Sequence, residues 1–235
     1  MNEVLLFFIL KYKGDWLKIY KALEDKEKVS IEDLISVRSK IKSDFISIIK
    51  DDYPKLLKQI YKPPFGLFTI GNSENLNNEK ITLIGDFKYE NLLPIINQGN
   101  NCAIITKIKK SNLTKIKMLA RKGFKLILIS EEGIQNALNN MKELLKYDNV
   151  LIISEHYQKN GMLSYSQPSQ RILMGLSYSA IINYDSNIDD INLTFEISKQ
   201  ESVPIYNFSN CPKKMIKKYG IKSIDECPFF NTLKN

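Results

Sequence analysis

Short apolar runs alternate with amphipathic stretches from about residue 80 onward. The runs predict strands at residues 81–85, 102–106, 125–130, 150–154, 179–184 and 203–208. Runs that are apolar on both sides suit the strands of a parallel sheet that helices cover on both faces. The stretches between them predict helices at residues 92–99, 112–123, 133–147, 170–177 and 192–201. This alternation predicts an α/β fold with a Rossmann-like, mostly parallel sheet flanked by helices.

The first part of the chain has a different pattern, in which apolar residues recur at helical spacing. Leu5, Phe8 and Ile9 begin this pattern. A second helical segment is predicted over residues 30–50, where Ser30 caps the helix and Asp33 follows three residues later. Residues 1–52 therefore predict a small helical N-terminal domain.

A connector separates this helical unit from the alternating region. Pro63 and Pro64 stop any helix there, and residues 65–71 predict a short strand before a polar loop at 73–80. We therefore divide the chain into a connector with its lead-in strand at 53–80, a Rossmann-like domain at 81–210 and a C-terminal tail at 211–235. The sequence does not decide whether that tail packs against the sheet.

The charge of the chain bears on its partners. The formal net charge is +8 and the pI is about 9.1, which favours a polyanionic partner, because phosphate contacts release condensed counterions. The alternative is an AT-rich genome, which raises the lysine content of every protein it encodes.

Cysteine content and apolar runs bear on location. Three cysteines without a C-x-x-C spacing argue against a disulfide framework and against a zinc site, and they favour a reducing, cytoplasmic setting. No run reaches the roughly 18 to 20 apolar residues of a membrane span. The apolar opening, residues 4–10, lacks the flanks of a signal peptide and is interpreted as the buried face of a helix.

Three stretches resemble the DNA-processing protein A (DprA/Smf) family. The first resembles the family's lead-in to the sheet and comprises Tyr53–Pro54, Leu57, Ile60, Pro63–Pro64, Leu67–Phe68 and Gly71–Asn72. The second, Ser154–Glu155–His156 and then residues 168–177, is similar to SEY followed by P-x-RNRIIAGLS. The third, Thr194-x-Glu196 and the strand after it, is similar to T-x-E-x-A. The three stretches occur in the family's order and span most of the chain.

The resemblance implies a protein that binds single-stranded DNA without sequence preference. It implies a role in DNA uptake, natural transformation and recombination, with a homodimer that loads a RecA-type recombinase. It implies no cofactor, no metal, no membrane association and no enzymatic activity.

The chain departs from the family at the DNA-binding loops. A G-[ST]-R turn is replaced by Gly85–Asp86–Phe87, and the SGLA-x-GID loop is replaced by residues 106–112. Of the RNR pair, Arg171 alone remains. These losses bear on the DNA pocket more than on the fold.

The candidate DNA-binding residues follow predicted strands. Lys107, Lys109 and Lys110 should emerge at the carboxyl end of the strand at 102–106, the edge at which open α/β sheets bind ligands. Gly85 ends the strand at 81–85 and Lys88 follows it, where a helix N-terminus could approach a phosphate. The alternatives are a solvated lysine loop and a simple turn glycine, next to an Asp86 that would repel a phosphate.

Arg171 is one of three arginines among 34 basic residues. It is predicted at the start of a helix, where its guanidinium could bind a phosphate through two hydrogen bonds. The alternative is a buried ion pair with Glu155 or Glu196.

The other chemically notable side chains lie in the last third of the chain. His156, the single histidine, is interpreted as a stacking or packing residue, because no nucleophile or base can be assigned to it. The remaining candidates are tyrosines that could stack on bases or fill space, and an acidic pair that could cap a helix: Tyr157, Tyr165, Tyr178, Asp189 and Asp190.

Two competing functions remain open. A paralogue with the family's fold could have lost DNA binding and act as an interaction scaffold. A nucleotide-processing enzyme, such as a phosphoribohydrolase, would need a catalytic acid beside a glycine-rich phosphate loop. Glu131, Glu132 and Glu155 are the available carboxylates, and nothing in the sequence places them beside such a loop.

Overall fold

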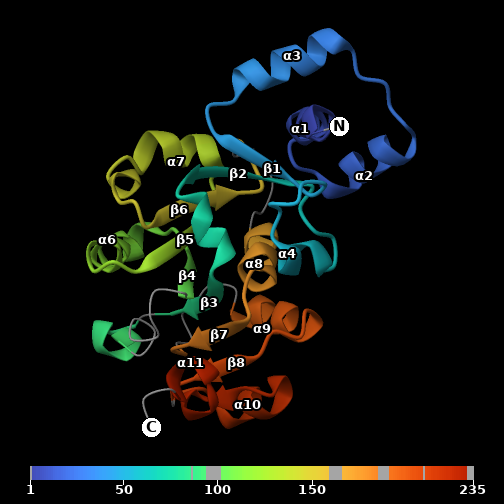
Figure 1. Cartoon of the computed structure of the whole chain (residues 1–235). Coiled ribbons are helices and arrows are strands. Elements are labelled where there is room, and N and C mark those ends of the chain that lie inside the picture. The colour runs from blue at the N-terminus through green and yellow to red at the C-terminus, as the bar shows by residue number, and fades with distance from the viewer. Residues whose placement is uncertain are drawn as a thin grey trace.

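The computed structural model describes residues 2–85, 87–93, 102–158, 166–184, 191–208 and 210–231, without the side chains of 166, 167, 230 and 231. Within these residues, a sheet of nine strands has the order β1-β2-β6-β5-β4-β3-β7-β8-β9 (Figure 1). The strands are β1 (Asp44–Ser47), β2 (Gly66–Gly71), β3 (Glu79–Ile84), β4 (Cys102–Lys107), β5 (Lys125–Ile129), β6 (Val150–Ser154), β7 (Ser179–Ile182), β8 (Ile205–Asn207) and β9 (Lys222–Ser223).

Within this order, the strands β6, β5, β4, β3, β7, β8 and β9 run parallel to one another. Strand β2 is antiparallel to both β1 and β6. The central strands are buried on both faces, as in Leu126 to Ile129. The predicted α/β class with a Rossmann-like, mostly parallel sheet is confirmed, and each of the six predicted strands is present.

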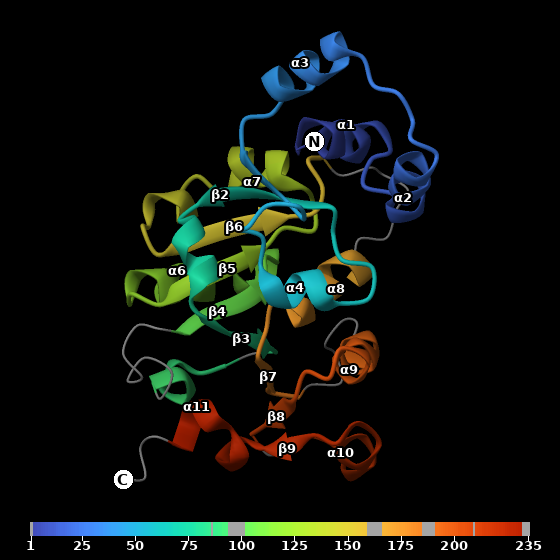
Figure 2. The same ribbon diagram turned by 45° about the vertical axis from the view of Figure 1, so that its right-hand side comes forward.

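Helices cover both faces of the sheet (Figures 1 and 2). One face packs against α4, α8, α9 and α10 through a core that includes Leu57, Leu173 and Phe195. The other packs against α6 and α7 through a core that includes Ile116 and Ala137. The bounds are α4 (Lys55–Gln59), α6 (Leu113–Arg121), α7 (Ile134–Asn140), α8 (Ser166–Gly175), α9 (Ile191–Gln200) and α10 (Lys213–Tyr219).

Three helices precede the sheet, namely α1 (Asn2–Lys11), α2 (Trp16–Glu24) and α3 (Ile31–Lys40). Helix α1 packs against α2, α3, β1 and β2, so the predicted N-terminal helical unit is present at one end of the sheet. The predicted cap is confirmed, because the Ser30 side chain accepts a hydrogen bond of 3.1 Å from the Asp33 N–H.

The helix predicted over residues 30–50 is wrong in its second half. Helix α3 ends at Lys40, and residues 44–47 form β1 instead. The physical reason is cross-strand pairing: Phe45 lies opposite Phe68 of β2, and the centroids of the two rings are 5.2 Å apart. The sheet therefore begins before residue 52, while the division into domains at 52, 80 and 210 stays a prediction.

The tail predicted at 211–235 packs against the sheet through β9 and the 3₁₀ turn η5 (Ile224–Glu226). It contains α10, β9, η5 and α11 (Pro228–Asn231), and its Ile221 and Cys227 are buried. The predicted polar loop at 73–80 contains η1 (Ser73–Asn77) and the first residues of β3. The helix predicted at 92–99 lies mostly outside the described residues. No helix in the described ranges has the length and apolarity that a membrane crossing requires.

Candidate nucleic-acid interface

The carboxyl ends of β3, β4, β5 and β6 meet at one edge of the sheet, because these strands are parallel neighbours. The chain places Gly85, Lys107, Glu131 and Glu155 at or just beyond those ends. Open α/β sheets bind their ligands at this edge. The structure thus brings most of the predicted DNA-binding residues to the edge that the sequence indicated.

Gly85 and Lys88 follow β3. The backbone of Gly85 has φ +99°, a conformation that side chains rarely adopt, so the turn after β3 requires glycine. Lys88 is exposed and immediately precedes the 3₁₀ turn η2 (Tyr89–Leu92). Asp86, which we expected to repel a phosphate, lies outside the described residues.

Lys107 does not extend into solvent, because it is buried at the end of β4. Its Nζ lies 2.6 Å from Oε1 of Glu131, which also accepts a hydrogen bond from the Ser169 hydroxyl. Burial alone would raise the pKa of Glu131, but the hydrogen bonds from Lys107 and Ser169 outweigh it and lower that pKa. The charge of Lys107 is therefore neutralised by the Glu131 carboxylate, which lies on the loop after β5, the strand next to β4.

Lys109 and Lys110 lie on a turn that the backbone and Asn112 fix. The N–H of Lys109 donates to Oδ1 of Asn112 at 2.9 Å, and the Asn112 amide donates to the Lys107 carbonyl at 2.9 Å. Lys109 is half-buried, whereas Lys110 is exposed at the start of η3 (Lys110–Asn112). This turn is rigid in its backbone and presents lysine at the sheet edge.

Arg171 is paired with Glu155, which is the alternative that the sequence left open. One guanidinium nitrogen, Nη2, donates to both carboxylate oxygens of Glu155 at 2.6 Å each. The two side chains are 15% and 8% exposed. Helix α8 begins at Ser166 rather than near residue 170, because a proline such as Pro168 is tolerated in a first helical turn. The prediction that Arg171 lies at a helix N-terminus is therefore wrong.

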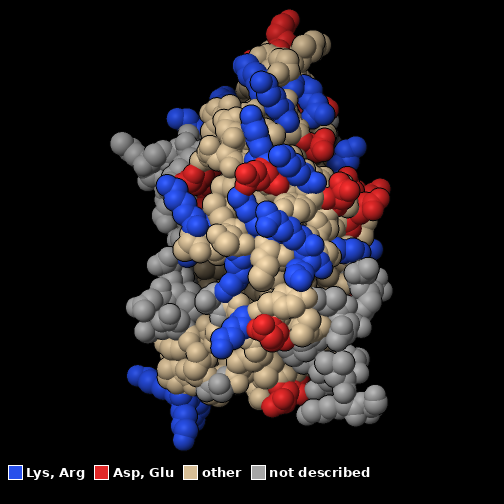
Figure 3. Space-filling view, turned by 90° about the vertical axis from the view of Figure 1, so that its left-hand side faces the viewer, with Lys and Arg blue, Asp and Glu red and all other residues tan. Residues whose placement is uncertain are grey.

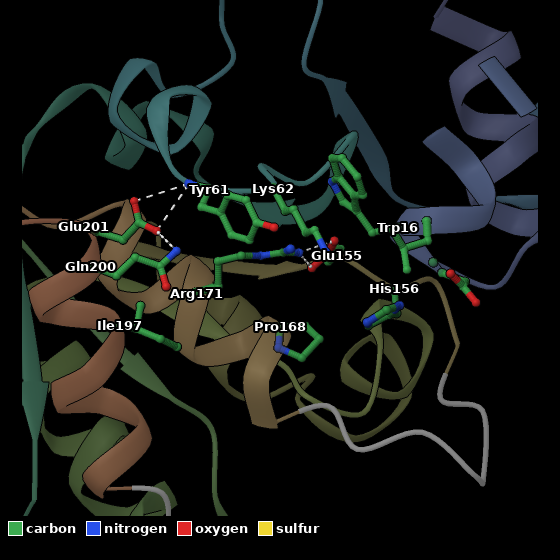
Figure 4. Close-up of a pocket in the computed structure, with 13 residues that line it drawn as sticks. Trp16, Tyr61, Lys62, Glu155, His156, Pro168, Arg171, Ile197, Gln200 and Glu201 are labelled. Atoms are coloured by element: carbon green, nitrogen blue, oxygen red, sulfur yellow. Dashed lines mark hydrogen bonds and ion pairs between the residues drawn. The ribbon is translucent and has the colours of Figure 1, made fainter. Parts of the chain in front are cut away.

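A cavity of about 350 Å³ lies beside this pair (Figure 4). It is bounded by the turn between α1 and α2, the turn between α4 and β2, the loop after β6, and helices α8 and α9. Its lining residues include Trp16, Tyr61, Lys62, Gln200 and Glu201 in addition to Arg171 and Glu155. The sequence alone assigned no functional role to Trp16, Tyr61, Lys62, Gln200 or Glu201. The local signal was the Pro63–Pro64 pair, which fixes the turn that carries Tyr61 and Lys62.

His156 is a packing residue, as interpreted from the sequence. Its imidazole is buried and lies against Gly14, where an added Cβ would overlap the ring. Burial is the main cause of its lowered pKa, which Glu155 raises and Arg171 lowers.

The remaining aromatic and acidic candidates are dispersed. The Tyr157 hydroxyl donates to the Lys40 carbonyl at 3.0 Å, and its ring packs on Phe68, so Tyr157 fills space. Tyr178 is 52% exposed and lines a separate hollow. Tyr165, Asp189 and Asp190 lie outside the described residues. No group of three or more His, Cys, Asp or Glu side chains suited to a metal ion occurs in the described part of the chain.

Positive charge is not confined to the sheet edge. Figure 3 shows Lys and Arg side chains scattered over much of the upper and middle part of one face, with Asp and Glu side chains between them. The broad distribution agrees with a lysine-rich composition, so position and local pairing distinguish the candidate lysines better than net charge does.

Comparisons with known proteins bear on this geometry. Residues 44–91 match the family model described as DNA recombination-mediator protein A. No curated protein matches the chain. The chain is similar to DNA processing protein A from Streptococcus pneumoniae, with a TM-score of 0.62 and 19% identity over 95% of this chain and 90% of that one. It is also similar to DNA processing protein A from Helicobacter pylori, whose structure concerns its single-stranded DNA binding mode, with a TM-score of 0.59 and 17% identity over 82% of this chain and 96% of that one.

Proposed function

We propose that the chain is a divergent member of the DNA-processing protein A family and that it binds single-stranded DNA without sequence preference. The observation that carries the proposal is the set of basic residues at the carboxyl edge of a sheet with this family's fold. A DNA strand that crosses this edge would meet the exposed side chains of Lys88 and Lys110. Lys109 lies between the end of β4 and the start of η3. Contacts of lysine with phosphates release counterions and do not depend on base sequence.

The two buried cations make a different contribution. Lys107 and Arg171 are each held by a carboxylate, so neither adds a full positive charge to the edge in this structure. We therefore assign the first phosphate contacts to Lys88 and Lys110, which are exposed, and a further contact to the half-buried Lys109. Gly85 supplies the turn that lets backbone N–H groups approach the strand.

The cellular role is proposed from the family resemblance. We propose that the chain acts in DNA uptake, natural transformation and recombination, as a cytoplasmic homodimer that delivers single strands to a RecA-type recombinase. We propose no catalytic step and no cofactor. Glu131 and Glu155, two of the carboxylates that a nucleotide-processing enzyme could use, are both engaged with cations.

A second function is favoured by those same ion pairs. If DNA binding requires Lys107 and Arg171, which carboxylates hold in this structure, the chain would be a scaffold that keeps the family's fold without binding DNA. One experiment separates the two functions: light scattering for the oligomeric state, together with binding of a fluorescent oligo-dT strand at low salt. Micromolar or tighter binding supports the first function, whereas a dimer without measurable binding supports the scaffold.

A further inference from the structure

The cavity between the N-terminal helices and the sheet is built around one short turn. Residues 61–64 connect α4 to β2, and three hydrogen bonds hold them in place. The Trp16 Nε1 donates to the Pro63 carbonyl at 2.8 Å, and the buried Tyr53 hydroxyl donates to the Pro64 carbonyl at 2.8 Å. The Tyr61 N–H donates to the Glu201 carboxylate, with distances of 3.2 and 3.4 Å to its two oxygens (Figure 4).

The backbone of this turn is strained at Lys62. Its φ is +52°, in the left-handed region that favours glycine, and the following proline restricts its backbone further. Strained residues persist where the surrounding structure holds them, and they cluster at binding sites. Here the strained turn places the side chains of Tyr61 and Lys62 at the cavity.

Tyr61 is an exposed ring on a hydrogen-bonded backbone. It is 64% exposed although the N–H of the same residue is hydrogen-bonded. The Nζ of Lys62 lies 5.3 Å from the centroid of the Tyr61 ring and 5.6 Å from that of Trp16. Trp16 itself stacks on Tyr20 and Phe65, whereas Tyr61 is 64% exposed with the Lys62 ammonium over its ring, so Tyr61 is the ring more open to a planar ligand.

The other walls combine apolar and hydrogen-bonding groups. Pro168 and Ile197 supply apolar surface, and the Gln200 amide donates to Glu201 at 3.0 Å. Arg171 points along the cavity to Glu155 (Figure 4). Its Nε is buried and has no hydrogen-bond partner within the described part of the chain, so the guanidinium meets the cavity through its other nitrogens.

The charge of the lining disfavours a phosphate as the main occupant. Three carboxylates line the cavity, those of Asp15, Glu155 and Glu201, against the two cations of Lys62 and Arg171. A neutral, planar ligand with donors and acceptors along its edge fits this lining better. A cavity of about 350 Å³ is also within the size range of small-molecule sites.

We propose that this cavity binds one unpaired nucleobase, stacked on Tyr61, with its edge toward the Arg171–Glu155 pair and Gln200. The base can come from a bound single strand, in which case the inference rests on the proposed function, or from a free nucleoside. The site is separate from the lysine turn at 107–112, which contacts phosphates.

Trp16 makes the proposal directly testable, since it is the single tryptophan of the chain and lines the cavity. Its fluorescence is recorded while the wild-type chain is titrated with an oligo-dT strand, with an abasic strand of equal length, and with each of the four deoxynucleosides. The expected result is a change in emission with the base-bearing strand and none with the abasic strand. A response to nucleosides alone identifies a free nucleoside as the ligand, and a response to strands alone identifies bound DNA.

Tyr61→Ala should weaken binding of oligo-dT about 5- to 150-fold, as expected for the loss of one stacked base. Tyr61→Phe keeps the ring and should bind like the wild type. Tyr178→Ala removes a similarly exposed tyrosine outside the cavity and should also bind like the wild type. Circular dichroism of each variant checks folding, and if Tyr61→Ala does not fold, the comparison of the two strands on the wild type decides the question.

The outcomes separate this inference from the proposed function. Equal affinity and equal emission for base-bearing and abasic strands would overturn the nucleobase site while leaving DNA binding intact. Binding of nucleosides without binding of any strand would support the nucleobase site and overturn the proposed function. No change of Trp16 emission with any probe, together with no binding of oligo-dT in an anisotropy titration, would overturn both.

Discussion

Arg171 of α8 and Glu155, which follows β6, form an ion pair with two hydrogen bonds of 2.6 Å, largely removed from solvent. Such a pair is costly to break from one side, because the remaining charge stays buried without a counter-charge. The pair also joins the sheet edge to the wall of the cavity. It is therefore a structural element of both proposed sites.

We expect Glu155→Gln to lower the free energy of unfolding by roughly 3 kcal/mol, because it leaves the Arg171 charge buried opposite a neutral amide. Urea denaturation measures this change. Glu196→Gln is the matched control: it removes the carboxylate of the exposed pair with Lys218 and should change stability little. Equal losses in the two variants would contradict the structural role of the buried pair.

Gly14→Ala should destabilise the chain by about 2 kcal/mol or more. Gly14 has φ +76°, and an added Cβ would overlap the His156 ring. Gly123→Ala is the control, because Gly123 has φ +86° but open space around it, so it should cost about 1 kcal/mol from backbone strain alone. Thermal or urea unfolding distinguishes them. If both variants lose the same stability, His156 does not pack against Gly14 as described.

The lowered pKa of His156 predicts a pH dependence of stability. Burial, the largest cause, disfavours its charged form in the folded chain, while the unfolded chain keeps the ordinary value of 6.5. Well above pH 6.5 the imidazole is neutral in both the folded and the unfolded chain. As the pH falls through 6.5, the unfolded chain binds a proton at this residue before the folded chain does. The free energy of unfolding therefore falls. The slope is at most about 1.4 kcal/mol per pH unit.

His156→Phe should flatten this dependence, because the chain has a single histidine. Urea midpoints between about pH 7.5 and about pH 5.5 measure both slopes. A variant slope as steep as that of the wild type would assign the titration to another group.

Much of the fold followed from the sequence because each central strand is buried on both faces and is therefore largely apolar, as in Val150 to Ile153 of β6. Strand β1 was missed because it has only four residues, a length too short to distinguish strand from helix by periodicity. Its stability comes from pairing with β2, which no local pattern encodes.

The site was predicted less completely, for a similar reason. Lys107 and Glu131 each follow a strand, but their contact depends on β4 and β5 being neighbours. The side chains of the cavity come from segments far apart in the sequence, as Trp16, Tyr61 and Gln200 illustrate. Local motifs were enough to place single residues at the sheet edge. Identifying the carboxylates that neutralise Lys107 and Arg171 required the tertiary structure.

The lysine turn gives a prediction with a charge-matched control. Lys109→Ala/Lys110→Ala should weaken oligonucleotide binding and lower the salt-dependence slope by about 1.4, since each phosphate contact on a single strand contributes about 0.7. Lys213→Ala/Lys214→Ala removes the same charge from the exposed face of α10 and should leave the slope nearly unchanged. Equal effects of the two double variants would mean that net charge, rather than the turn, governs binding.

The most direct test of the account is fluorescence anisotropy of a labelled oligo-dT strand titrated with the wild-type chain across a salt series. We predict a dissociation constant in the micromolar range or below at low salt. The logarithm of the association constant should fall steeply and linearly with the logarithm of the salt concentration. Flat anisotropy at low salt, with a folded protein, would contradict DNA binding and leave a scaffold with the family's fold.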